Sequence, residues 1–185
     1  ATTAGAITRG PVLEKIWLQQ YPAGVPAEID PSEYRSLREL IEQAIAQHRD
    51  RPCFTCMDRT LTYGDLDVLA TRFAAYLQQI ARLRKGDRIA LMLPNVLQYP
   101  VAILGAFRAG LTIVNTNPMY TPRELQHQLH DSGARAILIL ENFAHTLEEV
   151  RGDLDLDTVI IAGVGDLLSF PKSLLVNFAL RHVKK

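Results

Sequence analysis

The sequence predicts an α/β fold, with an open, mostly parallel sheet and helices on both of its faces. Four apolar runs without polar alternation, typical of strands buried on both faces, lie at residues 88–93, 111–116, 136–140 and 158–162. Helical periodicity occupies the intervals between these runs, and turn residues such as Pro94-Asn95 end the strands. Because strands that alternate with helices usually lie parallel in one sheet, the pattern favours this architecture.

The central unit of the chain is a strand, a helix and a second strand within residues 86–118. The helix expected at residues 96–109 is apolar almost all round, which is typical of a helix covered on several sides. Gly105 allows a close approach of backbones, and Gly110 stands where a left-handed C-terminal cap is expected. Such a unit crosses over right-handedly and requires further layers on both faces.

Three other helices are predicted by their caps, each a hydroxyl residue followed three positions later by a carboxylate. The pairs are Ser36 with Glu39, Thr62 with Asp65, and Thr121 with Glu124. Pro122 strengthens the third cap, because a proline at the first helical position lacks only an N–H that the helix does not use. The second of these helices is expected to end before Lys85-Gly86, and the third at Ser132-Gly133.

Weaker signals predict the remaining elements. The segments on either side of Asp58-Arg59 are expected to form a short hairpin around that turn. Asn142 is expected to cap a helix before the last strand. Residues 170–183 are predicted to form a final helix, with Pro171 in its first turn and a wide apolar face.

The bulk composition excludes several classes of protein. The 20 basic and 20 acidic side chains leave no basic surplus, so no nucleic-acid partner is expected. Hydrophobic residues make up 48% of the chain, but the longest apolar run, residues 101–107, is too short to span a membrane. Two cysteines and the lack of a secretory leader favour the cytoplasm. Residues 1–12 have no periodicity and are interpreted as an expression-vector remnant.

Two motifs with the spacing of metal ligands are interpreted as structural. Cys53 and Cys56 have C-x-x-C spacing, but no second pair exists, and residues three apart in a strand point to opposite faces. We therefore expect these cysteines to bind no metal and to form no disulfide with each other. His127 and His130 lie opposite the apolar side of their helix and are expected to face solvent.

No motif for nucleotide binding or nucleophilic catalysis is found. Gly163-Val164-Gly165 follows a strand but lacks the third glycine of a dinucleotide fingerprint, so it is interpreted as a turn. Neither G-x-x-x-x-G-K-[ST] nor the G-x-S-x-G elbow occurs. No catalytic residue and no metal site is therefore expected. The residues by themselves indicate a cytoplasmic parallel α/β domain without a readable function.

Several segments occur in an order that points to one family. They are L-T-Y-G-D-L at residues 61–66, K-G-D-R-I-A at 85–90 and G-A-F-R-A-G at 105–110. These motifs resemble those of adenylate-forming enzymes. The runs LPNVLQYPVAILGAFRAG, NTNPMYTPREL, HQLHDSGA and NFAHTLE are similar more specifically to bacterial long-chain fatty-acid–CoA ligases. Asp65 replaces the glutamate usual in that family, and either carboxylate can cap a helix.

The resemblance implies a parent enzyme that uses ATP, Mg²⁺ and coenzyme A. It converts a fatty acid through an acyl-adenylate into acyl-CoA, with release of AMP and pyrophosphate. The family's phosphate loop and C-terminal domain have no counterpart here, so residues 13–185 are expected to be the incomplete N-terminal subdomain of the ligase large domain. This part is expected to be inactive alone and to bind no cofactor. The alternative is a stand-alone α/β module that binds acyl groups or a partner without catalysis.

Four residues are candidates for contact with substrate in the intact enzyme: Asn95, Asn117, Pro118 and Tyr120. They follow strands at the end of the sheet where open α/β folds place their ligands. The alternative interpretation is a purely structural turn. Thr62, Asp65, Gly86, Gly105, Gly110, Thr121 and Glu124 are expected to serve the scaffold only.

The resemblance also implies partners. The remainder of the ligase chain is the first, and the intact enzyme would bind fatty acid and coenzyme A. A homodimer is left open. Two alternatives remain for the surface that covers the apolar helix within residues 168–185. One is the rest of the ligase domain, and the other is the inner membrane surface, by peripheral contact.

Overall fold

The computed structural model describes residues 14–182, which form two units divided after Arg35. The first unit contains a 3₁₀ helix, η1 (Ile16–Gln20), and an ion pair between Lys15 and Glu28. All the other helices and strands belong to the second unit, which is described below by itself. The proposed vector remnant, residues 1–12, lies outside the described residues.

Four parallel strands form the sheet of the second unit, in the order β4-β3-β5-β6. They are β3 (Arg88–Met92), β4 (Thr112–Asn115), β5 (Ala136–Leu140) and β6 (Thr158–Ala162). Ala90 lies opposite Val114 of β4 and Ile137 of β5. The open parallel sheet expected from the apolar runs is therefore confirmed.

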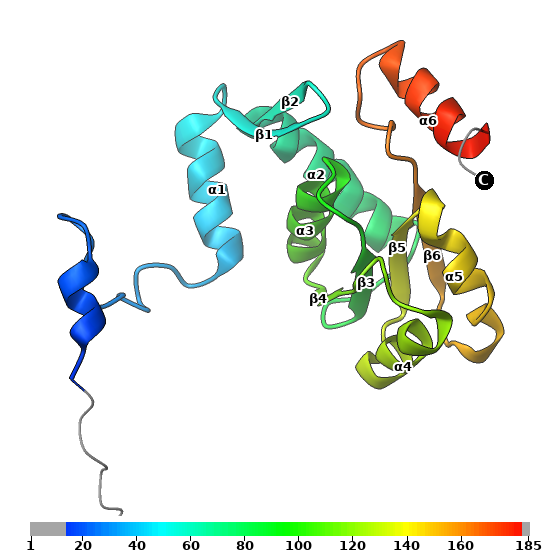
Figure 1. The fold of residues 1–185 in the computed structure, drawn as a ribbon, viewed down its shortest axis with the longest axis horizontal. Helices are drawn as coiled ribbons and strands as arrows, with labels where there is room; N and C mark the ends of the chain where they lie inside the picture. Colours follow the sequence, from blue (N-terminus) through cyan, green and yellow to red (C-terminus); the bar gives the residue numbers. More distant parts are fainter. Residues whose placement is uncertain (1–13, 183–185) are drawn as a thin grey trace, which may run out of the picture. The chain divides into compact units, whose positions relative to one another are not determined.

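Helices cover both faces of this sheet, as predicted (Figure 1). The helices are α2 (Tyr63–Gln79), α3 (Gln98–Ala109), α4 (Pro122–Ser132) and α5 (Ala144–Glu148). Alternate strand residues separate the two cores: Ile89 packs with α2 and α3, whereas Ala90 packs with α4 and α5. This division follows from the two-residue period of a strand.

A third hydrophobic cluster joins the remaining elements to α2 and α3. It includes Ile45 of α1 (Leu37–His48) and Leu61 of a two-stranded antiparallel hairpin. The hairpin pairs β1 (Pro52–Cys56) with β2 (Arg59–Thr62). Its two turn residues are Met57 and Asp58, both with positive φ, and not Asp58-Arg59 as expected. Two-residue turns of this kind match the twist of the paired strands.

The three predicted caps that begin with a hydroxyl residue are present. Thr62 with Asp65, and Thr121 with Glu124, form reciprocal capping boxes at α2 and α4, and the Ser36 hydroxyl accepts a hydrogen bond from the Glu39 amide. Gly110 adopts the left-handed conformation at the end of α3, with φ of 76°, and Gly86 has φ of 92°. These backbone angles favour glycine.

The helix before β6 begins differently from the prediction. Asn142 is not its N-cap, because it lies inside a short 3₁₀ helix, η2 (Glu141–Phe143), that leads directly into α5. An N-cap needs an extended backbone, which a residue within a helical turn cannot adopt. A second short 3₁₀ helix, η3 (Arg151–Asp153), follows α5.

The final helix, α6 (Lys172–His182), is attached to the sheet end through its polar side. Asn177 accepts a hydrogen bond from the Gly165 amide at 2.7 Å and donates one to Asp166 at 2.8 Å. Arg181 pairs with Glu141 at 2.8 Å. Three large apolar side chains of the helix are more than 60% exposed: Leu174, Leu175 and Phe178. Position 183 of the predicted helix lies outside the described residues.

Candidate functional site

The substrate-proximal candidates lie in two loops at the carboxyl end of the sheet. Asn95 follows β3, and Asn117, Pro118 and Tyr120 follow β4. Since β3 and β4 are neighbouring parallel strands, both loops leave the same end of the sheet. Ligands of open α/β folds bind at this end.

The side chain of Asn117 stabilises the local turn. Its Oδ1 accepts a hydrogen bond from the Met119 amide at 3.0 Å, and its carbonyl accepts one from the Tyr120 amide at 3.1 Å. Asparagine commonly stabilises turns in this way. Tyr120 packs with its ring partly buried against the core beneath α4. These contacts agree with the structural interpretation of the loop.

Asn95 is exposed, and its backbone contacts the hairpin. Its carbonyl oxygen lies 3.8 Å from the Cys56 thiol, which acts as a weak donor from the hairpin. The loop after β3 is therefore in contact with the β1–β2 hairpin, a relationship that the sequence did not reveal.

Two polar contacts at the end of β4 were not predicted. The Tyr99 hydroxyl donates a hydrogen bond to Asn115 Oδ1 at 2.9 Å, and the Gln128 side chain donates one to the Asn115 carbonyl at 3.1 Å. They connect α3 and α4 to the strand between them in sequence.

An apolar groove of ≈ 530 Å³ lies beside these loops, where β3, β5 and β6 end and α6 crosses. Asn142 is the one polar residue of its lining. The apolar residues are Met57, Pro94, Leu140, Phe143, Val164, Val176, Ala179 and Leu180. A groove with this lining suits an apolar ligand or an apolar side of another segment.

Both glycine amides of the loop after β6 donate hydrogen bonds to side chains of the protein. The Gly163 amide donates to Asp166 Oδ2 at 2.7 Å, and the Gly165 amide donates to Asn177 Oδ1 at 2.7 Å. A phosphate-binding loop requires such N–H groups to point at the ligand. The interpretation of Gly163-Val164-Gly165 as a turn is confirmed.

The geometric reason given for the two cysteines is wrong. The β1–β2 register shifts between Pro52 and Phe54, so Cys53 is the extra residue of a bulge. Cys53 and Cys56 consequently pack against the same core cluster and do not face opposite sides. Both are free thiols, and burial raises the pKa of Cys53. That they bind no metal and do not pair stays a prediction.

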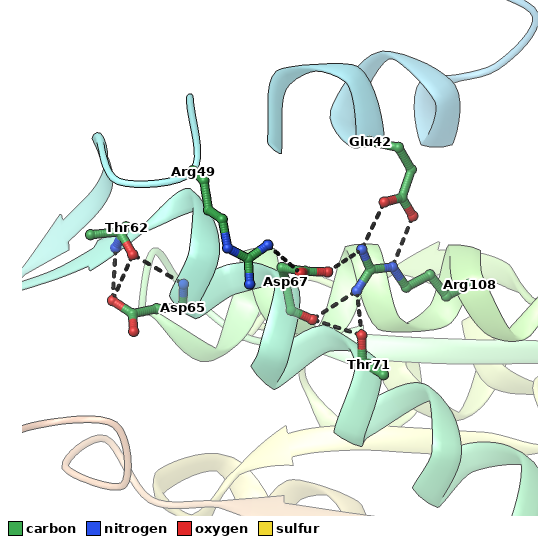
Figure 2. A network of polar contacts seen from close by, with 7 residues as sticks. All are labelled: Glu42, Arg49, Thr62, Asp65, Asp67, Thr71 and Arg108. Carbon is green, nitrogen blue, oxygen red and sulfur yellow. Dashed lines mark hydrogen bonds and ion pairs between the residues drawn. The ribbon is translucent and has the colours of Figure 1, made fainter. Parts of the chain in front are cut away.

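The densest charge cluster surrounds Arg108 (Figure 2). All five N–H groups of its guanidinium donate hydrogen bonds to other residues of the protein. Its partners are Glu42 of α1 and Asp67 and Thr71 of α2. Hydrogen bonds from Arg108 lower the pKa of Glu42. With every donor engaged, this cluster joins three helices and leaves no position for a ligand.

The described residues do not fit a nucleotide phosphate or Mg²⁺. Within residues 14–182, no three His, Cys, Asp or Glu side chains gather closely enough to hold a metal ion. His127 and His130 are both exposed, as expected. With the loop after β6 internally bonded as well, no step of an ATP-dependent reaction is assigned to these side chains.

Comparison with known proteins places this geometry in a family. A model described as AMP-binding enzyme matches residues 41–183. The long-chain-fatty-acid–CoA ligase of Escherichia coli O157:H7 is 52% identical over 94% of this chain and 31% of its own length. That of Bacillus subtilis is 34% identical over 88% of this chain and 29% of its own length.

Solved structures share the fold. A long-chain-fatty-acid-CoA ligase from Archaeoglobus fulgidus superposes with a TM-score of 0.65 at 21% identity, over 86% of this chain and 32% of its own. A luciferase-like enzyme from the mealworm Zophobas morio gives a TM-score of 0.67 at 24% identity, over 74% of this chain and 33% of its own. The chain thus spans about a third of these relatives, and the match over most of its residues shows that it belongs to the AMP-binding enzyme family.

Proposed function

We propose that the chain is the N-terminal part of an ATP-dependent long-chain fatty-acid–CoA ligase. The parent protein would join a fatty acid to coenzyme A through an acyl-adenylate, with ATP and Mg²⁺ as co-substrate and cofactor and AMP and pyrophosphate as products. The observation that carries this is the identity of 52% to such a ligase over 94% of the chain.

The 185-residue chain would serve as a scaffold in the parent enzyme. Its sheet presents the ends of β3 and β4 to the active site, while the groups that bind phosphate and magnesium would come from the remainder of the ligase. Charge stabilisation of the departing pyrophosphate is usually the largest catalytic term in such chemistry, and its donors are not found here. The isolated chain would therefore be inactive.

Fatty-acid-dependent exchange of pyrophosphate into ATP tests both statements. The 185-residue chain should show background exchange only, and the full gene product should show exchange that depends on fatty acid. Exchange above background by the pure 185-residue chain would contradict the scaffold role. A full product without exchange would contradict the ligase assignment.

Asn95, Asn117, Pro118 and Tyr120 remain the proposed substrate-proximal residues. Asn95 is the best of the four to test, because its side chain is exposed at the end of the sheet. The side chain of Asn117, by contrast, is already hydrogen-bonded within its own turn. Asn95→Ala in the full ligase should raise KM for one substrate without lowering the unfolding midpoint. Equal kinetics of Asn95→Ala and wild type would leave the loop with a structural role only.

The groove of ≈ 530 Å³ at the sheet end favours one second candidate, a stand-alone module that binds an acyl group or a partner. The mass of the product made from the chromosomal gene separates the two. A product about three times the length of this chain, in line with its 31% coverage of the relatives, supports the ligase. A product of this chain's own length supports the module.

We propose a cytoplasmic location, with the rest of the ligase domain as the cover of α6. Among the described helices, none combines the length and hydropathy that a membrane crossing requires. Peripheral contact of α6 with the inner membrane surface is the alternative cover, and a homodimer is the alternative partner. Sedimentation with anionic liposomes separates the membrane from the other two alternatives.

A further inference from the structure

A pocket of ≈ 350 Å³ lies between the strand β2, the helix α2 and the loop that follows β6. Its apolar wall includes Leu61 of β2, Val68 and Leu69 of α2, and Leu168 of the loop. Leu61 and Leu168 are buried, whereas Val68 is 41% exposed. The pocket therefore offers an apolar surface that a ligand reaches from solvent at Val68.

The acidic side chains of this pocket are already hydrogen-bonded within the protein. Oδ2 of Asp65 accepts hydrogen bonds from the amide and the hydroxyl of Thr62, both at 3.0 Å (Figure 2). The two carboxylate oxygens of Asp166 accept from the Gly163 amide at 2.7 Å and from the Asn177 side chain at 2.8 Å. These carboxylates therefore stabilise the start of α2 and the turn after β6.

The basic side chains of the pocket are not engaged in this way. Within residues 14–182, the guanidinium groups of Arg59 and Arg72 have no hydrogen-bond or ion-pair partner. Arg135 and Arg181, which line two larger pockets, are both ion-paired. Arg59 is also partly buried, and an unpaired charge that has lost part of its hydration gains more from a counter-ion than an exposed one. A guanidinium presents five N–H donors in a planar fork that matches an anionic group.

The charges of the pocket favour a monoanion over a dianion. Two guanidiniums and two carboxylates line it, so their formal charges cancel. Hydrogen bonds from Thr62, together with the charge of Arg59, lower the pKa of Asp65, which therefore stays ionised at neutral pH. A carboxylate of one charge pairs with the guanidiniums, whereas a phosphate of two charges is also repelled by Asp65 and Asp166. The hydroxyl of Ser169, also in the lining, is a further donor.

We propose that this pocket binds a carboxylate attached to a short apolar chain. The carboxylate accepts hydrogen bonds from Arg59 and Arg72, and the chain lies against Val68, Leu69 and Leu168. The pocket is near the lower end of the range of ligand sites, about 300–1,000 Å³, so a short chain fits it. None of the residues proposed to lie near substrate lines this pocket, so the inference goes beyond the proposed function and does not rest on it.

Titration calorimetry with octanoate tests the proposal on the 185-residue chain. Octanoate should bind saturably at one site. Acetate, which lacks the chain, and octanol, which lacks the charge, should each bind at least about tenfold more weakly. Octyl phosphate, a dianion at about pH 8, should also bind more weakly than octanoate. Octanoate that binds no better than acetate or octanol would overturn the proposal, and tighter binding of octyl phosphate would overturn the choice of a carboxylate.

Two single substitutions locate the binding. Arg59→Gln and Arg72→Gln should each weaken octanoate binding at least about tenfold. Neither should shift the urea midpoint, because neither side chain has a hydrogen-bonded partner to lose. Arg123→Gln is the matched control, since Arg123 is exposed on α4 and does not line the pocket. Wild-type affinity in either pocket variant would overturn the proposal.

The exposed apolar side of α6 is the competing place for a ligand with an apolar chain. The variant Leu174→Ser/Phe178→Ser should bind octanoate as the wild type does, and a loss of binding would move the site to α6 and overturn the proposal. A photoreactive analogue of octanoate provides an independent measurement. It should label peptides from residues 59–72 or 166–169, and labelling confined to other peptides would overturn the placement.

The outcome is separate from that of the ligase assignment. A full gene product that is active in pyrophosphate exchange, together with a 185-residue chain that does not bind octanoate, would overturn this pocket and leave the proposed function intact. Saturable binding that depends on both arginines, together with a full product without exchange, would support the pocket and contradict the ligase function.

Discussion

Nη2 of Arg108 lies 2.8 Å from Oε2 of Glu42, and this contact joins α3 to α1 across 66 positions of sequence (Figure 2). The same guanidinium also holds Asp67 of α2, and the Arg108 side chain is only 13% exposed. The side chain of Arg108 thus connects the three helices α1, α2 and α3. The contact therefore helps to hold α1, in which Ile45 is the one buried residue.

We expect Arg108→Ala to lower the free energy of unfolding by about 2–4 kcal/mol, because two partly buried carboxylates lose the guanidinium that they share, and only the more exposed Arg49 and Arg38 remain beside them. The matched control is Arg38→Ala. Arg38 also faces Glu42, but at 3.9 Å and with its side chain 57% exposed, so we expect a loss of at most about 1 kcal/mol. Urea unfolding measures both. Equal losses would show that Arg108 contributes no more than a surface ion pair.

The network also predicts a dependence of stability on pH. Hydrogen bonds from Arg108 lower the pKa of Glu42 below its ordinary 4.5. Burial acts to raise the pKa of Asp67, but hydrogen bonds from Arg108 and Arg49 outweigh it and lower that pKa below 3.8. A carboxyl with a lowered folded-state pKa stabilises fully above its unfolded pKa, and this contribution is lost as the pH falls through the folded pKa.

We therefore expect the unfolding free energy to fall as the pH is lowered from about 5 to about 3, and to fall less steeply in Arg108→Ala. Asp65, Asp87 and Glu124 also have pKa values lowered by hydrogen bonds, but they contribute equally to both proteins. Urea unfolding at several pH values gives the two slopes. Parallel slopes would show that Glu42 and Asp67 do not depend on Arg108.

Gly105 is expected to be required for the packing of α3 on α2. A Cβ at this position would lie 2.8 Å from Cδ1 of Phe73 and 3.1 Å from the Ala70 carbonyl oxygen. Gly105→Ala should destabilise the chain by about 1–3 kcal/mol. Gly152→Ala is the control, because a Cβ there meets nothing within 4 Å, and it should be neutral or slightly stabilising. Thermal unfolding compares them, and an equally harmless Gly105→Ala would contradict the close packing.

The exposed side of α6 gives the last prediction. If the rest of the ligase covers Leu174 and Phe178, the 185-residue chain and its Leu174→Ser/Phe178→Ser variant should sediment equally with anionic liposomes. A chain that ends before residue 168 provides a further comparison. Pelleting of the wild type alone would contradict this expectation and make the membrane surface the cover. Self-association that both changes abolish would instead indicate a protein partner.

The sequence by itself determined the elements whose signals are local. Apolar runs specify buried strands, and Thr62 with Asp65 or Thr121 with Glu124 specify helix starts, because these contacts join residues only three apart. The left-handed cap at Gly110 has the same local origin. The motifs that resemble the ligases were readable for this reason too, since each is a short continuous segment.

Only the tertiary structure decided how distant segments meet. The bulge at Cys53 arises from pairing with β2, and it places both cysteines on one core although alternation predicts opposite faces. The helix α6 turns its polar Asn177 inward, because that side chain satisfies the amide and carboxylate of the loop after β6. The contact of Arg108 with Glu42 has no sequence signal at all. Such features depend on which partners the fold brings within hydrogen-bonding distance, and periodicity and spacing along the chain carry no information about those partners.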